Sequence, residues 1–169
     1  MSNLTAFAAR GPLKTLVSAT AKFLVANGVT IPVGAYTLLP GTSADTANRG
    51  YLDNYQNFAT AIYVGYCIGA STPGDLSTSN TIVGNTSPGT GHNVPAASCE
   101  IGSHILLNYP VTNGSAQSDV GKKVYLSNNN DLTLTAGNSP AVGRIVGYTS
   151  ATQFDVMMYG MIGADLLVG

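Results

Sequence analysis

The C-terminal third of the chain, residues 119–158, constrains the fold more than any other stretch. It consists of short runs of strand-forming residues separated by tight polar turns. The turn at 128–131 is built from Asn and Asp, which tolerate left-handed backbone angles and bond to their own backbone. Residues 132–135 alternate apolar and polar side chains, which is the period of a half-buried strand. The pattern predicts strands at 123–127, 132–135, 142–148 and 154–158.

The composition is that of a globular chain with an unusually neutral surface. Of the 169 residues, 44% are hydrophobic, and only 9% are charged, against roughly 25% in an average soluble domain. This length is enough for one well-buried domain. A surface covered by hydroxyl and amide groups resists self-association less well than a charged surface. We therefore expect a protein whose normal state is an assembly.

The charge balance and the apolar runs exclude several classes of function. The net charge is −1, from seven Lys plus Arg and eight Asp plus Glu, so there is no basic footprint for nucleic acid. No apolar run approaches the length that spans a bilayer. The N-terminus lacks a basic region followed by a clean apolar core, and it is a poor secretion signal. We expect neither nucleic acid nor membrane as a partner.

Strand patterns also occupy the first two thirds of the chain. Asn27-Gly28 is a strong turn signal and predicts a hairpin between 23–25 and 29–31. Further strands are expected at 35–39, at 62–68, which is apolar enough to be buried on both faces, and at 99–111. The chain is thus predicted to be all-β, a small barrel or a compact β-sandwich of short strands.

Three segments fall outside this strand pattern. Residues 1–20 are predicted to form an N-terminal arm, residues 21–160 a single β domain, and residues 161–169 an apolar C-terminal tail. Within the domain, residues 70–97 form a long polar loop around one apolar island. Loops of this length in compact domains are uncommon and are usually functional or disordered.

Two parts of the sequence resemble each other. Val33-Gly34 precedes an aromatic strand, as Val120-Gly121 does, and Val64-Gly65-Tyr66 follows the first as Val146-Gly147-Tyr148 follows the second. The pattern suggests one β unit that is used twice. A glycine inside a strand permits a bulge or a close backbone approach.

The order of these features resembles the head decoration (cement) proteins of tailed bacteriophages. The resemblance covers roughly residues 29–159. It rests on a strand entered through Val33-Gly34, a strand that closes on Val64-Gly65, the segment 121–127 that leads through a polar turn to 132–134, and the segment 142–147 followed by a closing strand at 154–156. It does not cover the arm or the polar loop. Other virion β modules share this style, so a head fibre or a receptor- or carbohydrate-binding β module is the alternative.

The resemblance implies a structural role. Such proteins commonly form homotrimers on the capsid exterior of the virion, after synthesis in the host cytoplasm, and bridge neighbouring major capsid proteins. Low affinity per contact becomes strong binding when several subunits engage at once. Apolar ends need a surface to lie against, because burying each large side chain contributes about 1.5–3 kcal/mol. The predicted subunit or capsid contacts are Phe7, Leu13, Leu16, Ile82, Val83, Met161, Ile162, Leu166 and Leu167.

No catalytic, cofactor-binding or metal site is predicted. His92, Cys99, Glu100 and His104 lie close together in sequence, but their spacing matches no zinc site and there is no CxxC. There is no Gly-x-Ser-x-Gly elbow and no phosphate-binding Gly-Lys-Ser/Thr. We expect a protein without enzymatic activity. Cys67 could pair with Cys99, or both could remain reduced and buried.

The main rival to a virion role is sugar binding, which usually uses exposed aromatic side chains. The chain has no Trp and nine Tyr. Five tyrosines sit inside strand patterns and are expected in the core or in an interface: Tyr36, Tyr63, Tyr66, Tyr125 and Tyr148. Tyr51, Tyr55 and Tyr109 are expected to be freer.

Overall fold

The computed structural model describes residues 13–15, 19–26, 28–39, 51–54, 61–71, 76–84, 95–128, 131–137 and 140–161. Strands dominate these residues, with one short 3-10 helix at Gln117–Asp119, so the predicted all-β class is confirmed. The strands are β1 (Leu13–Thr15), β2 (Thr20–Leu24), β3 (Thr30–Pro32), β4 (Tyr36–Leu39), β5 (Asp53–Asn54), β6 (Ile62–Ala70), β7 (Thr81–Val83), β8 (Ala96–Glu100), β9 (Ser103–Thr112), β10 (Lys123–Leu126), β11 (Leu132–Thr133), β12 (Ala141–Ser150) and β13 (Gln153–Tyr159).

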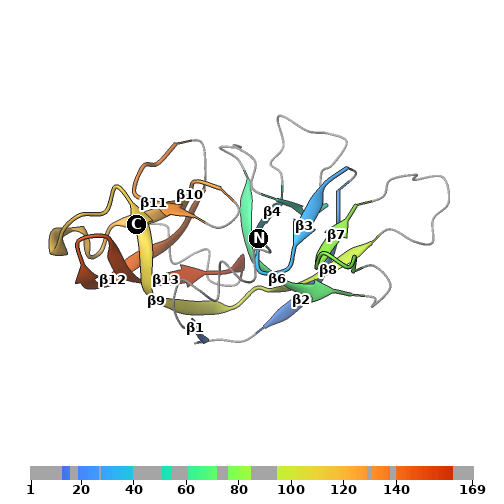
Figure 1. Ribbon diagram of the computed structural model, residues 1–169, viewed down its shortest axis with the longest axis horizontal. Helices are drawn as coiled ribbons and strands as arrows, with labels where there is room; N and C mark the ends of the chain where they lie inside the picture. The colour runs from blue at the N-terminus through green and yellow to red at the C-terminus, as the bar shows by residue number, and fades with distance from the viewer. Residues whose placement is uncertain are drawn as a thin grey trace.

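The C-terminal strands close into a five-stranded barrel, here called the C-barrel. Its strand order is β9-β11-β10-β12-β13, and β13 pairs back with β9. The β9–β11 pair is parallel and the other four pairs are antiparallel. These strands gather on the left of Figure 1, in yellow to red. Closure removes the free sheet edges that would otherwise attract other strands.

The N-terminal strands form a second barrel, here called the N-barrel, on the right of Figure 1. Its order is β2-β8-β6-β4-β5, all antiparallel. An isolated parallel bridge between Val25 and Leu52 connects the ends of β2 and β5 and completes the circle. Two backbone bonds hold this closure, from Ala26 N to Leu52 O at 2.9 Å and from Leu52 N to Leu24 O at 2.7 Å.

The two barrels have the same topology: their strands follow one another around the barrel in the same order, here called the strand circuit. In chain order, β2, β4, β5, β6 and β8 of the N-barrel correspond to β9, β10, β11, β12 and β13 of the C-barrel. In each barrel the first and third of these strands are joined in parallel, through Val25 and Leu52 in one and through Val111 and Leu132 in the other. The internal repeat expected from the sequence is therefore a repeated β-barrel.

The correspondence extends to single backbone bonds. Gly34 has φ +89 and donates its N–H to Cys67 O at 2.7 Å, and Gly121 has φ +92 and donates to Ile145 O at 2.8 Å. In both barrels the accepting residue returns a bond to the carbonyl of the residue after the glycine. Glycine adopts this positive φ without steric cost. Gly34 and Cys67 thus occupy the positions of Gly121 and Ile145.

The strand register corrects the match that the sequence suggested between Gly65 and Gly147. Gly65 and Gly143 each pair with the second residue of the facing strand, and a bulge follows in both cases. The equivalent of Gly65 is therefore Gly143, and Gly147 corresponds to Gly69. Val-Gly occurs twice in 142–147. Sequence similarity alone does not show which of the two matches Val64-Gly65, and the strand register decides it.

Glycine is required at these two matched positions by close backbone approach. A Cβ on Gly65 would lie 1.8 Å from the carbonyl oxygen of Glu100, and a Cβ on Gly143 would lie 2.3 Å from that of Met157. Real Cβ atoms do not approach so closely, so any side chain would push the neighbouring strand away. Such glycine kinks let a small barrel curve tightly.

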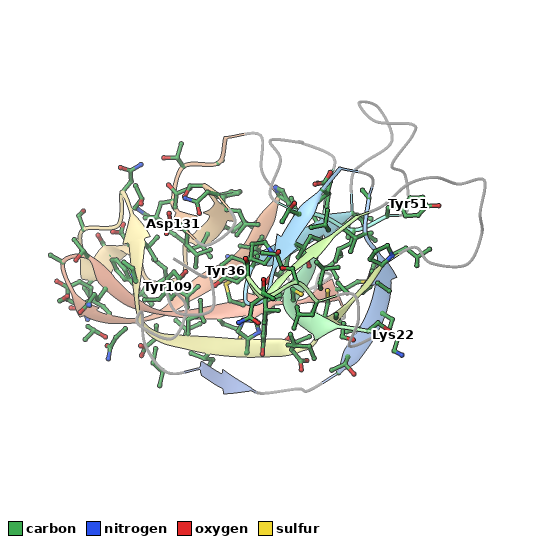
Figure 2. The ribbon with its side chains drawn as sticks, turned by 45° about the vertical axis from the view of Figure 1, so that its right-hand side comes forward. Lys22, Tyr36, Tyr51, Tyr109 and Asp131 are labelled. Carbon is green, nitrogen blue, oxygen red and sulfur yellow. The ribbon has the colours of Figure 1, made fainter. Side chains whose placement is uncertain are left out.

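Each barrel has its own core, and the core of the C-barrel also includes side chains from the outside of the N-barrel. The N-barrel interior contains Val64, Cys67 and Cys99, together with Ile31 and Ile82 from the β3–β7 ribbon. The C-barrel interior extends outward to four residues of the N-barrel: Tyr36, Leu38, Ala61 and Tyr63. The outer face of β4 and β6 is thus buried against the C-barrel, and Figure 2 shows Tyr36 between the two halves.

Several expectations for the first half of the chain were wrong. The segments 23–25 and 29–31 do not form a hairpin, because β2 pairs with β8 and β3 pairs with β7. The turn between them does exist, with Gly28 at φ +72. The stretch 70–97 is not one long loop, since it contains β7 and the beginning of β8. The strand predicted over 99–111 is interrupted at 101–102, between β8 and β9.

The N-terminal arm is partly integrated into the fold. β1 pairs antiparallel with β9, with Leu13 opposite Leu106 and Thr15 opposite His104. The described part of the arm therefore lies against its own chain. The strands from Thr20 to Tyr159 fall in the range expected for the single β domain, where they form two barrels that share a buried interface.

Candidate functional site

Large apolar side chains on the surface are the first candidates for a contact site. In the described part of the chain, seven are at least 40% exposed: Leu24, Ile62, Ile68, Val83, Val120, Val146 and Tyr148. Single exposed apolar residues are normal and need no explanation. Exposed apolar residues at equivalent positions of the two barrels are more informative than single ones.

Ile68 and Val146 do follow the repeat. Ile68 lies in the bulge between Cys67 and Gly69, and Val146 lies in the matching bulge between Ile145 and Gly147. Both side chains are 43% exposed. A bulge inserts one residue that has no partner and redirects its side chain. Each barrel therefore presents one aliphatic side chain at the same position of the same circuit.

The surroundings of these two residues differ in charge. Across the N-barrel sheet from Ile68 lies Ser98, which pairs with the exposed Lys22 of β2, seen at the edge of the molecule in Figure 2. Across from Val146 lies Asp155, whose Oδ1 accepts a bond from Asn108 N at 3.0 Å. The aliphatic side chain of the C-barrel bulge thus faces a strand position that holds a carboxylate, whereas that of the N-barrel bulge faces one that holds a neutral hydroxyl.

Val120 is presented by a turn that one carboxylate organises. Asp119 Oδ2 accepts bonds from Ser115 N at 2.8 Å and Ala116 N at 3.0 Å, while Asp119 Oδ1 pairs with Lys122 Nζ at 2.6 Å. The Lys122 ammonium, together with the two N–H donors, lowers the pKa of Asp119 to about 2. The carboxylate stays ionised at neutral pH and holds the turn before β10.

The residues predicted to contact another subunit or the capsid lie in different environments. Ile82 is fully buried in the N-barrel core, so the prediction that its side chain faces a partner is wrong, because the island it belongs to forms β7. Val83 is 50% exposed and Met161 is half-buried. Leu13 lies in β1. The remaining predicted contacts lie outside the described residues: Phe7, Leu16, Ile162, Leu166 and Leu167.

A buried carboxylate fixes the junction between the barrels. Glu100 ends β8, and its Oε1 accepts bonds from Ala19 N at 2.8 Å and from Gly102 N at 3.0 Å. Ala19 precedes β2, and Gly102 lies in the short link from β8 to β9. Charge-assisted bonds of this kind are stronger than neutral ones. Glu100 therefore ties the start of one barrel to the start of the other.

His104 lies beside this junction and is completely buried. In the described part of the chain neither of its ring nitrogens has a hydrogen-bond partner, and the Tyr66 ring contacts it edge-on at 5.1 Å between centroids. Burial lowers the pKa of His104 to about 4, although the nearby Glu100 charge acts in the opposite direction. The imidazole is therefore neutral at physiological pH.

The thiols inside the N-barrel are also held in their neutral form. Burial raises the pKa of Cys67 to about 11 and that of Cys99 to about 12. Thr37 Oγ1 donates a weak bond to Cys99 Sγ at 3.8 Å. A thiol with so high a pKa is a poor nucleophile in the closed fold. The buried polar groups of the N-barrel and of the junction hold the structure together and are not open to a substrate.

In the described part of the chain, no group of three or more His, Cys, Asp or Glu side chains could hold a metal ion. His92 lies outside these residues. The Asn128–Asp131 turn is closed by bonds between its own ends, including Asp131 N to Asn128 Oδ1 at 2.8 Å. The described chain also has no helix that is long and apolar enough to cross a membrane.

One expectation about tyrosine was wrong. Tyr109, expected to be freer, is buried in the C-barrel, because its position in β9 faces inward. Tyr148, expected in the core or in an interface, lies outside the core: it is 40% exposed and packs edge-on against Phe154, with centroids 5.7 Å apart. Tyr51 is half-buried at the far end of the N-barrel (Figure 2), and Tyr55 lies outside the described residues.

Sequence reasoning missed Ile68 and Val146 as a matched pair. A signal was present, since each follows a Val-Gly pair by three residues and precedes a glycine. Finding it requires the alignment of Gly65 with Gly143, which the strand register provides.

Comparison of the chain with protein-family models, with curated proteins and with solved structures finds no match.

Proposed function

We propose that this chain is a structural virion protein, without enzymatic activity, that binds the outside of a phage capsid as a homotrimer and bridges major capsid proteins. The observation that supports it most is the repeat: one chain carries two barrels of the same circuit, and each exposes an aliphatic bulge residue at the same position, Ile68 and Val146.

Two equivalent contact points on one chain are suited to a partner that is present in many identical copies. A capsid presents the same major capsid protein many times, so two related points on one chain can engage two neighbouring copies. Each contact alone is small, because one aliphatic side chain contributes about 1.5–3 kcal/mol when fully buried. Linking the contacts in one chain, and again in a trimer, raises the overall affinity through effective concentration.

The distribution of polar groups supports a structural role. Four ionisable side chains at the junction and in the N-barrel are buried: Glu100, His104, Cys67 and Cys99. Glu100 binds backbone N–H groups, and His104 packs against Tyr66. Charged residues are few, and amide and hydroxyl side chains are well suited to hydrogen bonds with a protein lattice.

The proposal is tested by sedimenting the protein with expanded and unexpanded heads of its phage. We expect binding to expanded heads, a loss of about tenfold in affinity for Ile68→Ser or Val146→Ser, and a larger loss for the double variant. Leu24→Ser is the matched control, because Leu24 is an aliphatic side chain of similar exposure, 44%, that does not lie in a bulge. Wild-type binding by the double variant would contradict the bridging role.

A head fibre or a carbohydrate-binding module is the second candidate. The exposed Tyr148 favours it, since a tyrosine face can stack on a sugar ring. A glycan screen distinguishes the two, with Tyr148→Ala as the variant that loses sugar binding. Light scattering measures the assembly state, for which three times 17.3 kDa is the expected mass.

A further inference from the structure

The two cysteines occupy a special position in the N-barrel sheet. Cys67 of β6 and Cys99 of β8 face each other directly in the antiparallel register. Both side chains are fully buried and belong to the same core, so they lie on the inner face of the barrel. Neighbouring strands therefore place two thiols side by side, out of contact with water.

The hydrogen bonds define which kind of cross-strand pair this is. Cys67 N donates to Ala35 O at 2.9 Å, and Cys67 O accepts from Gly34 N at 2.7 Å. Both partners lie just before β4, on the side of β6 away from β8. Cys67 therefore makes no backbone bond to Cys99, and the two form a non-hydrogen-bonded pair.

This kind of pair brings side chains closest together. In non-hydrogen-bonded antiparallel pairs the Cα atoms are about 4.5 Å apart, which falls within the Cα–Cα range of about 4.4–6.8 Å for disulfides. The Cβ atoms are also closer than in hydrogen-bonded pairs. At present Cys67 Sγ points to Gly69 O and Cys99 Sγ points to Thr37 Oγ1, both at 3.8 Å. These are weak contacts that rotation about χ1 can replace.

We propose that Cys67 and Cys99 form an intramolecular disulfide when the protein meets a low-molecular-weight disulfide such as oxidised glutathione. The thiolate of Cys67 attacks the glutathione disulfide, forms a mixed disulfide and releases one glutathione thiolate. The Cys99 thiolate then attacks the Cys67 sulfur and releases the second. Two electrons pass to the glutathione disulfide, and the two protein protons end on the two glutathione thiols.

Cys67 is the better first nucleophile. It adjoins the bulge at Ile68, whose side chain is 43% exposed, so local opening of this bulge gives a reagent access to Cys67 first. Because both thiols are buried and neutral, the fully folded protein reacts slowly, and oxidation is fastest during folding or local opening. The bond would staple β6 to β8, the two strands that flank residues 71–95.

The C-barrel provides an internal comparison. The residues that correspond to Cys67 and Cys99 are Ile145 and Val156, which face each other in the matching register. The same position therefore holds two ordinary aliphatic side chains in one barrel and two thiols in the other. The staple would be confined to the N-barrel, and it does not depend on the proposed capsid role.

The test is to refold the full chain from urea in a buffer with excess oxidised over reduced glutathione, block free thiols under denaturing conditions and measure the intact mass. Refolding exposes both thiols to the reagent, so burial cannot prevent the reaction. We expect unblocked monomer about 2 Da lighter than the reduced chain, with Cys67 and Cys99 in one linked peptide. The melting temperature should rise by about 5–10 °C relative to reduced protein.

Other outcomes overturn the proposal. Two blocked thiols, stable glutathione adducts or disulfide-linked dimers would each show that the pair does not close within the chain. The Cys99→Ala variant is the matched control, because its single thiol can take glutathione but cannot form the internal bond. Hydrogen exchange should slow in β6 and β8 after oxidation and remain unchanged in β12 and β13.

Discussion

The buried His104 makes the free energy of unfolding depend on pH, and replacing this one residue should remove that dependence. Its pKa is about 4 in the folded chain against 6.5 for an unperturbed imidazole. Because the folded pKa is lowered, the stability is fully present above pH 6.5 and is lost as the pH falls toward 4. At pH 5 the unfolded imidazole is about 97% protonated and the folded one about 10%. The folded state therefore loses about 2 kcal/mol between pH 7 and pH 5 from this group.

His104→Leu removes the titration while filling most of the same space. Urea unfolding at pH 7 and pH 5 measures the loss of stability for the variant and for the wild type, and the variant should lose about 2 kcal/mol less. Tyr66→Phe is the control, because it keeps the ring against His104 and does not titrate in this range. If His104→Leu and wild type lose the same stability, the reasoning that places a neutral imidazole between the barrels is refuted.

Two further predictions concern the backbone of the N-barrel and its junction. Gly65→Ala should cost at least about 4 kcal/mol because its Cβ would lie 1.8 Å from Glu100 O, whereas Gly69→Ala, with nothing within 4 Å, should change stability by about 0.5 kcal/mol or less. Urea unfolding measures both, and equal costs would argue against the close approach of β6 and β8. Glu100→Gln should cost about 1–3 kcal/mol, because it weakens the bonds from Ala19 N and Gly102 N. It should also lower the pKa of His104 further, and an unchanged histidine titration by NMR would contradict this coupling.

The C-terminal third was the most predictable part of the fold. Strands expected at 123–127, 142–148 and 154–158 occur as β10, β12 and β13, with ends shifted by a few residues. They are joined by local connections, and β10 and most of β13 bury alternate side chains, so pattern and turn chemistry describe this region well. The first half was less predictable, because β2 and β3 find their partners in β8 and β7, which are far away in the sequence.

The candidate site was much less predictable than the fold. Ile82 was expected at a contact because it stands in a polar stretch, yet the β3–β7 pairing carries it into the core. Tyr109 was expected to be freer and is buried in the C-barrel core, because a strand position alone does not say which side chains a closed barrel encloses. Ile68 and Val146 became visible only as members of matching bulges.

By itself, the sequence determined the all-β class, the short strands with polar turns and the existence of a repeat, because these depend on local periodicity and on residues such as Gly34 and Gly121. Only the tertiary structure decided that the repeat is a pair of closed barrels, which residues match, that the outer face of β4 and β6 is buried, and that Cys67 faces Cys99. The physical reason is that closure, register and burial arise from hydrogen bonds between distant segments. A single strand pattern is compatible with many such pairings, and their combined packing selects one.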